Sequence, residues 1–308
     1  MAAELEPADR THHNCPAVKA AIINADDFGM SPEANAGIIR SHRDGVVTSA
    51  SLMVASPAAE QAAALAKDFP TLDVGLHAVV CQGYSVLPPD RLGGLVDSRR
   101  AFTDNPAAGG IRYFLSRRLR ARLADELRAQ VDRHLALIGY LNHIDGHLNF
   151  HVHPVLADIL VRLAVEYRVP FIRLPREPLM PTLATARDHL ARKLIESVVF
   201  RSLCARAAGK LREHNIKTTD RLFGLYQSGH QTESWLMRIV ENLPDGLCEF
   251  YFHPAIALPD RPPPPADRVL ECSILCSPAL RSALERKRVA LTTFAAVNSL
   301  PCPNLGRG

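Results

Sequence analysis

The stretch IINADDFGMS, residues 22–31, places two acidic side chains at the end of an apolar run. The apolar residues are typical of a buried strand, whereas Asp26 and Asp27 carry like charges that repel each other and are costly to bury without a partner. Parallel α/β proteins gather their functional side chains at the carboxyl ends of their strands. The stretch therefore predicts a first strand that delivers a pair of carboxylates to a site.

Apolar, β-rich runs alternate with helical patterns along the rest of the chain. The runs that we expect to form strands cover residues 18–26, 46–54, 72–80, 141–148, 169–174, 247–252 and 289–294. Between them, Ser31 and Pro32 are typical of a helix start, apolar residues recur every four positions from Leu119 to Leu135, and Pro154 opens a helix over 154–167.

About seven alternations of strand and helix predict a parallel α/β architecture. No GxGxxG motif follows the first strand, so the usual dinucleotide-binding reason for a doubly wound sheet is missing. We therefore predict one domain over residues 1–308, a distorted (β/α) barrel of about seven parallel strands that carries a helical insertion.

Composition narrows the classes of function. The 308 residues carry a net charge of only +4, and few aromatic residues are interleaved with the basic ones, so we expect no nucleic-acid partner. No apolar run approaches the ~18 residues of a membrane span, and the acidic N-terminal segment lacks the apolar core of a signal peptide. We expect a cytoplasmic protein whose seven scattered cysteines, without a CxxC pair, stay reduced.

Two long segments interrupt the alternation. Residues 81–110 are rich in Gly and Pro, which predicts an active-site loop. Residues 181–220 form the helical insertion, in which an apolar stripe is surrounded by basic residues. That helix could pack on the barrel, form a homodimer contact, or rest on an anionic membrane surface.

Five of the expected strands bring a titratable side chain to one rim. Asp26 and Asp27 end the first strand and His77 ends the third. The remaining candidates, from the fourth, fifth and sixth strands, are Asp145, His147, Arg173 and His253. Each alone could be structural, but their joint placement favours a catalytic site.

Residues 143–154, HIDGHLNFHVHP, hold four of the thirteen histidines. On an extended strand, His147, His151 and His153 would share one face, so the face does not select a ligand. Pro154 belongs in a first helical turn, which means that the strand ends earlier and leaves His147 at its mouth. His151 and His153 then fall in a loop, where they could bind substrate or support other ligands.

One carboxylate and two imidazoles form a common set of ligands for a divalent metal ion. Asp27, His77 and His147 would leave open positions for water and substrate. The paired aspartates then divide the work, since one binds the cation and the other accepts a proton from bound water. We expect zinc, although these ligands also admit magnesium, manganese or cobalt.

These motifs resemble one family. NADDFG at 24–29, GLH at 75–77, DGH and HVHP within 145–154, and FHP at 252–254 are similar, in the same order, to the YdjC/ChbG carbohydrate deacetylases. The longer insertion after RLPREP, residues 173–178, most resembles the hopanoid-biosynthesis-associated, HpnK-like branch. Two features depart from the family pattern: two extra residues before HVH, and Ala255 in place of the glycine of HPG.

The resemblance implies a distorted (β/α) barrel, a divalent metal on Asp27, His77 and His147, and Asp26 as general base. The implied reaction removes the N-acetyl group from an amino sugar, which for the HpnK-like branch is an N-acetylglucosaminyl hopanoid lipid. We expect His253 as the general acid, Arg173 as a partner of Asp26 or another carboxylate, and Asp145, His151 and His153 near the substrate. The alternatives are a metal-dependent phosphoesterase and a non-catalytic barrel that binds sugar or lipid.

Overall fold

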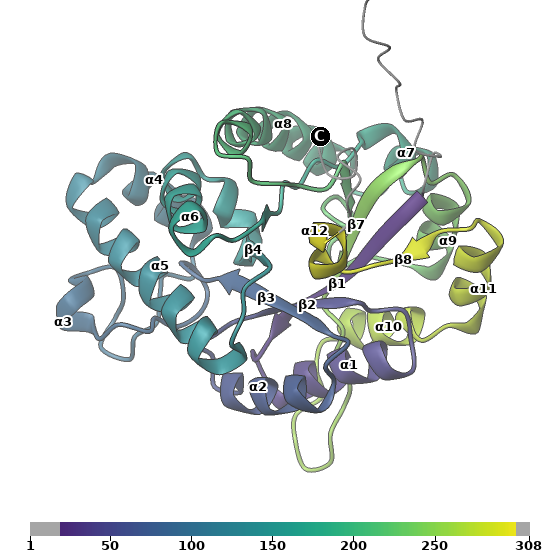
Figure 1. The fold of residues 1–308 in the computed structure, drawn as a ribbon, viewed down its shortest axis with the longest axis horizontal. Coiled ribbons are helices and arrows are strands. Elements are labelled where there is room, and N and C mark those ends of the chain that lie inside the picture. The colour runs from purple at the N-terminus through teal and green to yellow at the C-terminus, as the bar shows by residue number, and fades with distance from the viewer. Residues whose placement is uncertain (1–18, 300–308) are drawn as a thin grey trace, which may run out of the picture.

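The computed structural model describes residues 19–299, in which parallel strands occupy the centre and helices surround them (Figure 1). The strands are β1 (Lys19–Phe28), β2 (Ser49–Leu52), β3 (Asp73–Ala78), β4 (His143–Gly146), β5 (Phe171–Ile172), β6 (Arg221–Phe223), β7 (Gly246–Phe252) and β8 (Ala290–Leu291). Every pairing between them is parallel. Asp145 lies on β4, as expected, whereas His147 follows that strand.

The sheet curls into a barrel. Its order is β5-β4-β3-β2-β1-β7-β6, and β8 pairs with β1 outside that path. The two ends of the path approach each other, because Phe171 forms a parallel bridge to Lys217 and the Leu222 amide donates to the Arg176 carbonyl at 3.3 Å. The predicted distorted barrel of about seven parallel strands is thus confirmed.

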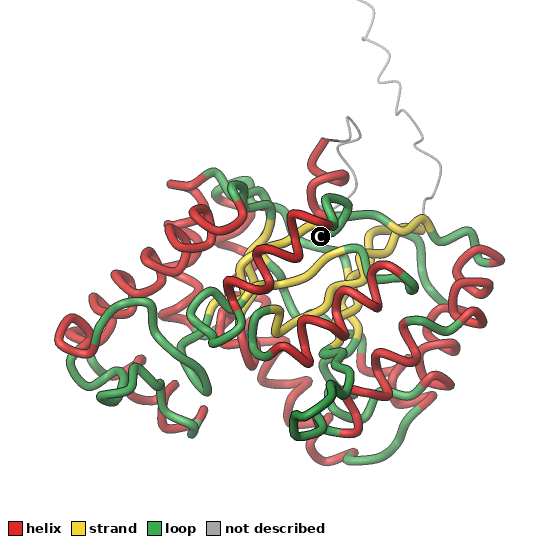
Figure 2. The backbone as a smooth tube through the Cα atoms, turned by 90° about the horizontal axis from the view of Figure 1, so that it is seen from below, coloured by secondary structure: helices red, strands yellow, loops and turns green. Residues whose placement is uncertain are grey.

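Helices surround the strands (Figure 2), and the last of them along the chain packs its Phe294 against Phe171 and His143 of the strands. They are α1 (Pro32–Arg43), α2 (Ala59–Asp68), α3 (Pro89–Leu92), α4 (Pro106–Leu115), α5 (Arg117–Ile138), α6 (Pro154–Tyr167), α7 (Leu179–Thr185), α8 (Leu190–Glu213), α9 (Glu233–Glu241), α10 (Ala266–Leu275), α11 (Pro278–Arg286) and α12 (Phe294–Ser299). A short 3₁₀ segment, His147–Val152, separates β4 from α6.

Local sequence signals explain where several helices begin and which face they bury. The Ser31 hydroxyl accepts a hydrogen bond from the Ala34 amide at 3.2 Å, which caps α1 directly before Pro32. On α5, Leu123, Leu127 and Val131 are fully buried, and they are members of the predicted stripe with its four-residue spacing.

The segment 81–110 contains more regular structure than expected, whereas the insertion is helical, as predicted. Within 81–110, α3 and two isolated antiparallel bridges order the chain, and residues 106–110 already belong to α4. Asn105 and Pro106 supply the start signal for α4, because the Asn105 side chain accepts from the Ala108 amide. The insertion contains α7 and α8, after which the chain returns to the sheet as β6, a strand of three residues that the sequence pattern did not reveal.

Two further expectations concern cysteines and membranes. Within the described part of the chain, the cysteines are free thiols, namely Cys81, Cys204, Cys248, Cys272 and Cys276; Cys15 and Cys302 lie outside it. Among the helices that the structure describes, none combines the length and apolar character that a membrane crossing requires.

Candidate metal centre

The end of β1 presents both aspartates to one cavity. The register of β1 against β2 shifts between Ala25 and Phe28, and Asp27 has a left-handed φ of 64°. A regular strand would turn Asp26 and Asp27 to opposite faces. The irregular backbone explains how the two neighbours can line the same cavity, and such a strained conformation of a non-glycine residue is typical of functional sites.

Asp27, His77 and His147 converge at the carboxyl ends of β1, β3 and β4. The Oδ1 atom of Asp27 lies 3.1 Å from His147 Nδ1 and 3.5 Å from His77 Nε2. One donor atom from each residue falls within 4.8 Å of the other two, and all three residues are buried. The sequence predicted this combination, and the fold brings it together.

The donor atoms of this cluster suit a divalent metal ion. Asp27 Oδ1 and His77 Nε2 are both buried and neither forms a hydrogen bond with any described residue. Unsatisfied buried polar atoms are costly, so their convergence indicates that a ligand completes the site. Two imidazoles and a carboxylate oxygen match zinc chemistry and also admit magnesium, manganese or cobalt.

Asp145 fixes the orientation of His77. Its Oδ1 atom lies 2.7 Å from His77 Nδ1, and its Oδ2 atom accepts from the Ser51 hydroxyl at 2.7 Å. A histidine that donates one ring nitrogen to a carboxylate presents the other nitrogen as a metal ligand. Asp145 therefore acts on His77, and its predicted contact with substrate remains a prediction.

A second acidic cluster surrounds Arg173. This side chain is 1% exposed, and it donates to Asp26 through Nη1 at 2.7 Å and Nη2 at 2.8 Å. The same guanidinium contacts Asp145 Oδ2 at 2.8 Å and Glu249 Oε1 at 2.6 Å. Asp26, His77 and Asp145 could also hold a metal by distance, but the guanidinium already occupies the carboxylates of that set. Its partner carboxylates thus include Asp26, one of the options left open by the sequence.

Buried opposite charges decide the protonation states of the cluster. Burial alone would lower the pKa of the His77 imidazole, but Asp145, Asp26 and Asp27 outweigh it and raise that pKa to about 9. Burial alone would raise the pKa of the Asp27 carboxyl. Nearby cationic groups, His147 foremost, nevertheless hold that pKa well below its usual range. Without a metal, the Asp27 carboxylate and the His77 imidazolium therefore carry opposite charges, and a metal ion would have to displace the proton on the imidazole.

The cluster opens into a cavity of about 340 Å³. Asp26, Asp27, His77 and His147 line one wall, and His253 faces them from beyond the end of β7. The His253 side chain is 19% exposed, and burial lowers the pKa of its imidazole. Five of the predicted residues thus line one cavity, and a sixth, Arg173, contacts Asp26, which is one of the five.

His151 and His153 lie apart from the residues that line this cavity. His151 is 2% exposed beneath the backbone of Gly146, and burial lowers the pKa of its imidazole to about 4. His153 precedes α6, where its Nδ1 atom accepts from the Val155 amide at 3.3 Å. Their predicted contact with substrate stays a prediction.

Several residues that complete the centre were not foreseen. Arg268, at the start of α10, donates to Asp27 Oδ2 at 2.7 Å, which leaves Oδ1 directed at the histidines. Asn24 donates to Asp26 Oδ1 at 2.7 Å, and Gln82 brings the segment 81–110 to the cavity. The sequence did contain a signal for Asn24. It lies two positions before Asp26, and residues two apart on a strand point to the same face.

Comparisons with known proteins agree with this geometry. A profile of the family described as "YdjC-like protein" matches residues 20–286. A carbohydrate deacetylase of Brevibacillus brevis is 33% identical to this chain, over 89% of this chain and 98% of the relative. A carbohydrate deacetylase of Geobacillus stearothermophilus is 30% identical, over 89% of this chain and 96% of the relative. A solved structure from Enterococcus faecalis, described provisionally as a cellobiose-phosphate cleavage protein, has a TM-score of 0.70 at 24% identity. It covers 91% of this chain and 99% of its own, and it supports the fold alone.

Proposed function

The chain belongs to the YdjC-like protein family, and from that premise we propose that it is a metal-dependent deacetylase of N-acetylglucosamine-type sugars. One observation carries the proposal. The unpaired donor atoms of Asp27 and His77 meet His147 at a cavity where a second carboxylate, Asp26, stands beside them. Relatives that cover nearly the whole chain are described as carbohydrate deacetylases, which supports the same reaction.

Asp27, His77 and His147 would hold the metal, with Asp145 and Arg268 fixing two of these ligands from behind. A divalent ion in such a site lowers the pKa of a bound water and polarises an amide carbonyl. Zinc is our first expectation. Magnesium, manganese and cobalt remain compatible with the same ligands.

Asp26 is the proposed general base. Arg173 and Asn24 hold its carboxylate through three hydrogen bonds, and its Oδ2 atom accepts only one of them. A carboxylate oxygen can accept about two hydrogen bonds, so Oδ2 keeps a lone pair for a proton. Arg173 therefore acts as a positioning residue, which keeps Asp26 at the cavity without consuming its capacity as a base.

His253 is the proposed general acid for the leaving amine. It lines the cavity that Asp26 and Asp27 also line. Because burial lowers the pKa of its imidazole, His253 is mostly neutral at pH 7. It would therefore gain a proton during the reaction before it donates one, and the proton that Asp26 removes from water is a suitable source.

The finer substrate assignment rests on the HpnK-like insertion. We propose a lipid-linked substrate, an N-acetylglucosaminyl hopanoid, reached by a cytoplasmic protein that contacts the inner membrane surface or forms a homodimer through α8. Exposed apolar side chains on α8 support such a contact: Ile195 is 66% and Val198 72% exposed. Phe200 and Leu203, by contrast, pack against the core, so they are poor candidates for contact with lipid.

Acetate release tests the proposal. Protein loaded with zinc or cobalt is incubated with N-acetylglucosaminyl substrates, with and without a hopanoid tail, and with an aryl phosphate. We expect acetate from the N-acetylated sugars and no phosphate release. A preference for the tailed substrate would support the HpnK-like assignment, whereas phosphate release without acetate would favour a phosphoesterase. Metal binding without either product would favour a non-catalytic binding barrel.

A further inference from the structure

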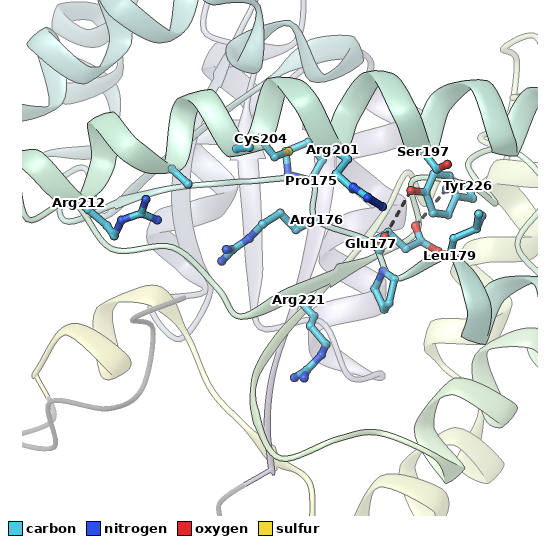
Figure 3. Close-up of a pocket in the computed structure, with 13 residues that line it drawn as sticks. Pro175, Arg176, Glu177, Leu179, Ser197, Arg201, Cys204, Arg212, Arg221 and Tyr226 are labelled. Atoms are coloured by element: carbon cyan, nitrogen blue, oxygen red, sulfur yellow. Dashed lines mark hydrogen bonds between the residues drawn. The ribbon is translucent and has the colours of Figure 1, made fainter.

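A second, larger cavity lies outside the barrel, between α8 and the strands that close it. It has a volume of about 600 Å³ and shares no lining residue with the metal centre. One wall is α8, and the other is the segment 175–179 together with the start of β6 (Figure 3). We refer to this cavity as the α8 groove.

Four arginines line the α8 groove. Arg201 and Arg212 project from α8, whereas Arg176 comes from the segment 175–179 and Arg221 from the start of β6 (Figure 3). Within residues 19–299, none of these four guanidinium groups forms an ion pair, in contrast to Arg173 in the barrel. The Arg176 guanidinium donates to the Thr219 carbonyl and the Arg221 guanidinium to the Asp245 carbonyl, and the Nε atom of Arg176 is buried without a partner among the described residues.

Like charges that line one cavity are unfavourable without a counter-ion. Burial lowers the pKa of the Arg176 guanidinium. The positive charges of Arg212 and Arg221 lower this pKa further, whereas Cys204 and Asp220 raise it. The Asp220 carboxylate is already engaged by the Leu247 amide at 2.7 Å. An anion in the groove would relieve this repulsion.

The acidic residue that lines the α8 groove cannot supply that anion. Glu177 Oε2 accepts from the amides of Gly224 and Tyr226, and its Oε1 atom accepts from the Thr182 hydroxyl. Burial also raises the pKa of this carboxyl to about 7. Both carboxylate oxygens of Glu177 thus already accept hydrogen bonds, whereas the Arg201 and Arg212 guanidinium groups form none with described residues.

The chemistry of the lining selects the class of ligand. Guanidinium groups bind phosphate oxygens in bidentate fashion, and a phosphomonoester carries close to two negative charges at neutral pH. The remaining lining includes apolar side chains, among them Pro175, Leu179 and Ala208, and the volume far exceeds that of one phosphate group. We propose that the α8 groove binds an organic phosphate, a phosphomonoester or diphosphate with an apolar body, whose phosphate contacts guanidinium groups from this set of four arginines.

Inorganic pyrophosphate is the probe for the charged half of this ligand. Binding is measured by titration calorimetry on chelator-treated, full-length protein, so that no metal ion provides a competing site. The test variant is Arg201→Gln/Arg212→Gln, since both side chains are exposed and neither forms a hydrogen bond with described residues. The matched control is Arg206→Gln/Arg238→Gln, which removes the same charge from exposed positions outside the groove.

We expect the wild type and the control to bind pyrophosphate alike and the groove variant to bind about tenfold more weakly or worse, because charge-assisted hydrogen bonds are lost. A second variant, Ala205→Glu, places a carboxylate in the groove and should also block binding. No binding by the wild type, or equal weakening in the groove variant and its control, would overturn the proposal.

Vesicles distinguish the two sources of such a phosphate. Co-sedimentation is compared on vesicles of phosphatidylcholine with and without phosphatidic acid. Retention by phosphatidic acid that is lost in Arg201→Gln/Arg212→Gln and kept in the control assigns the site to a lipid headgroup. Pyrophosphate binding without retention on vesicles assigns it to a phosphate in solution, and either result supports the groove as a phosphate site.

Discussion

Replacing Arg173 with methionine would test whether the acidic cluster depends on a single guanidinium. This side chain is buried and donates to Asp26, Asp145 and Glu249 at 2.6–2.8 Å. Methionine keeps much of the volume but removes every one of these donors. The variant would leave carboxylates buried without their counter-charge, a situation that is strongly destabilising in proteins.

The expected loss can be bounded from the partners that remain. Burial already raises the pKa of Glu249 to about 7, so this carboxyl becomes neutral at little cost once Arg173 is gone. Asp145 keeps its contacts to Ser51 and His77, and Asp26 keeps only Asn24. Breaking a buried pair by removing one partner costs about 3–5 kcal/mol, and we expect a loss of unfolding free energy in that range at pH 7.

Chemical denaturation of chelator-treated protein measures this loss. In the wild type, burial opposes ionisation of Asp145, but the nearby cations, Arg173 foremost, hold the pKa of this carboxyl below its usual range. This interaction stabilises the fold at every pH above the pKa that Asp145 has in the unfolded chain. The variant lacks that gain, so its deficit should persist from pH 7 down to about 4 and shrink as the pH falls further below the unfolded pKa of Asp145. Arg128→Met is the control, because Arg128 pairs in bidentate fashion with Glu166 at an exposed site and its loss should leave the unfolding midpoint near that of the wild type. Equal, pH-independent effects of the two substitutions would refute the reasoning.

Three other variants probe the rest of the account. His147→Ala should lose stoichiometric metal by elemental analysis, and a full complement of metal held by His151 or His153 would instead make one of these the ligand. Asp26→Asn should retain metal but slow acetate release about 10²–10⁴-fold, the usual contribution of a general base, and near-normal turnover would place the base elsewhere. Glu177→Gln mimics the protonated carboxyl, whose raised pKa of about 7 makes the wild type lose stability as the pH rises from about 5 to 8. The variant should lack that loss of stability, which amounts to at most about 3 kcal/mol. If the unfolding free energies of the wild type and the variant changed with pH in parallel, Glu177 would not be the group responsible.

The barrel was predictable because its longer strands are continuous apolar runs. The sequence pattern missed β6, since three residues are too few to show any periodicity and their assignment as a strand depends on pairing with β7. Pairing also explains why β5 and β8 have only two residues each, whereas the apolar runs around them are longer. Short strands in a closing barrel are defined by their neighbours, which no local pattern contains.

The convergence of the three proposed metal ligands was predictable for a different reason. In a parallel barrel, strand ends converge, so His77 and His147 could be assigned to the site of Asp27 from order alone. Arg268 could not, because it reaches Asp27 from 241 positions away, after a proline-rich connection whose path the sequence does not define. The left-handed conformation of Asp27 was likewise hidden, since non-glycine residues seldom adopt it.

Titration of divalent metal back into chelator-treated protein, with acetate release from an N-acetylglucosamine oligomer as the readout, tests the central claim most directly. We predict that acetate release rises with added metal, reaches its maximum at one equivalent per chain, and is absent in Asp27→Ala at every metal concentration. Acetate release by the chelated protein at the rate of the loaded one, or one equivalent of bound metal without acetate from any N-acetylglucosaminyl substrate, would contradict the account.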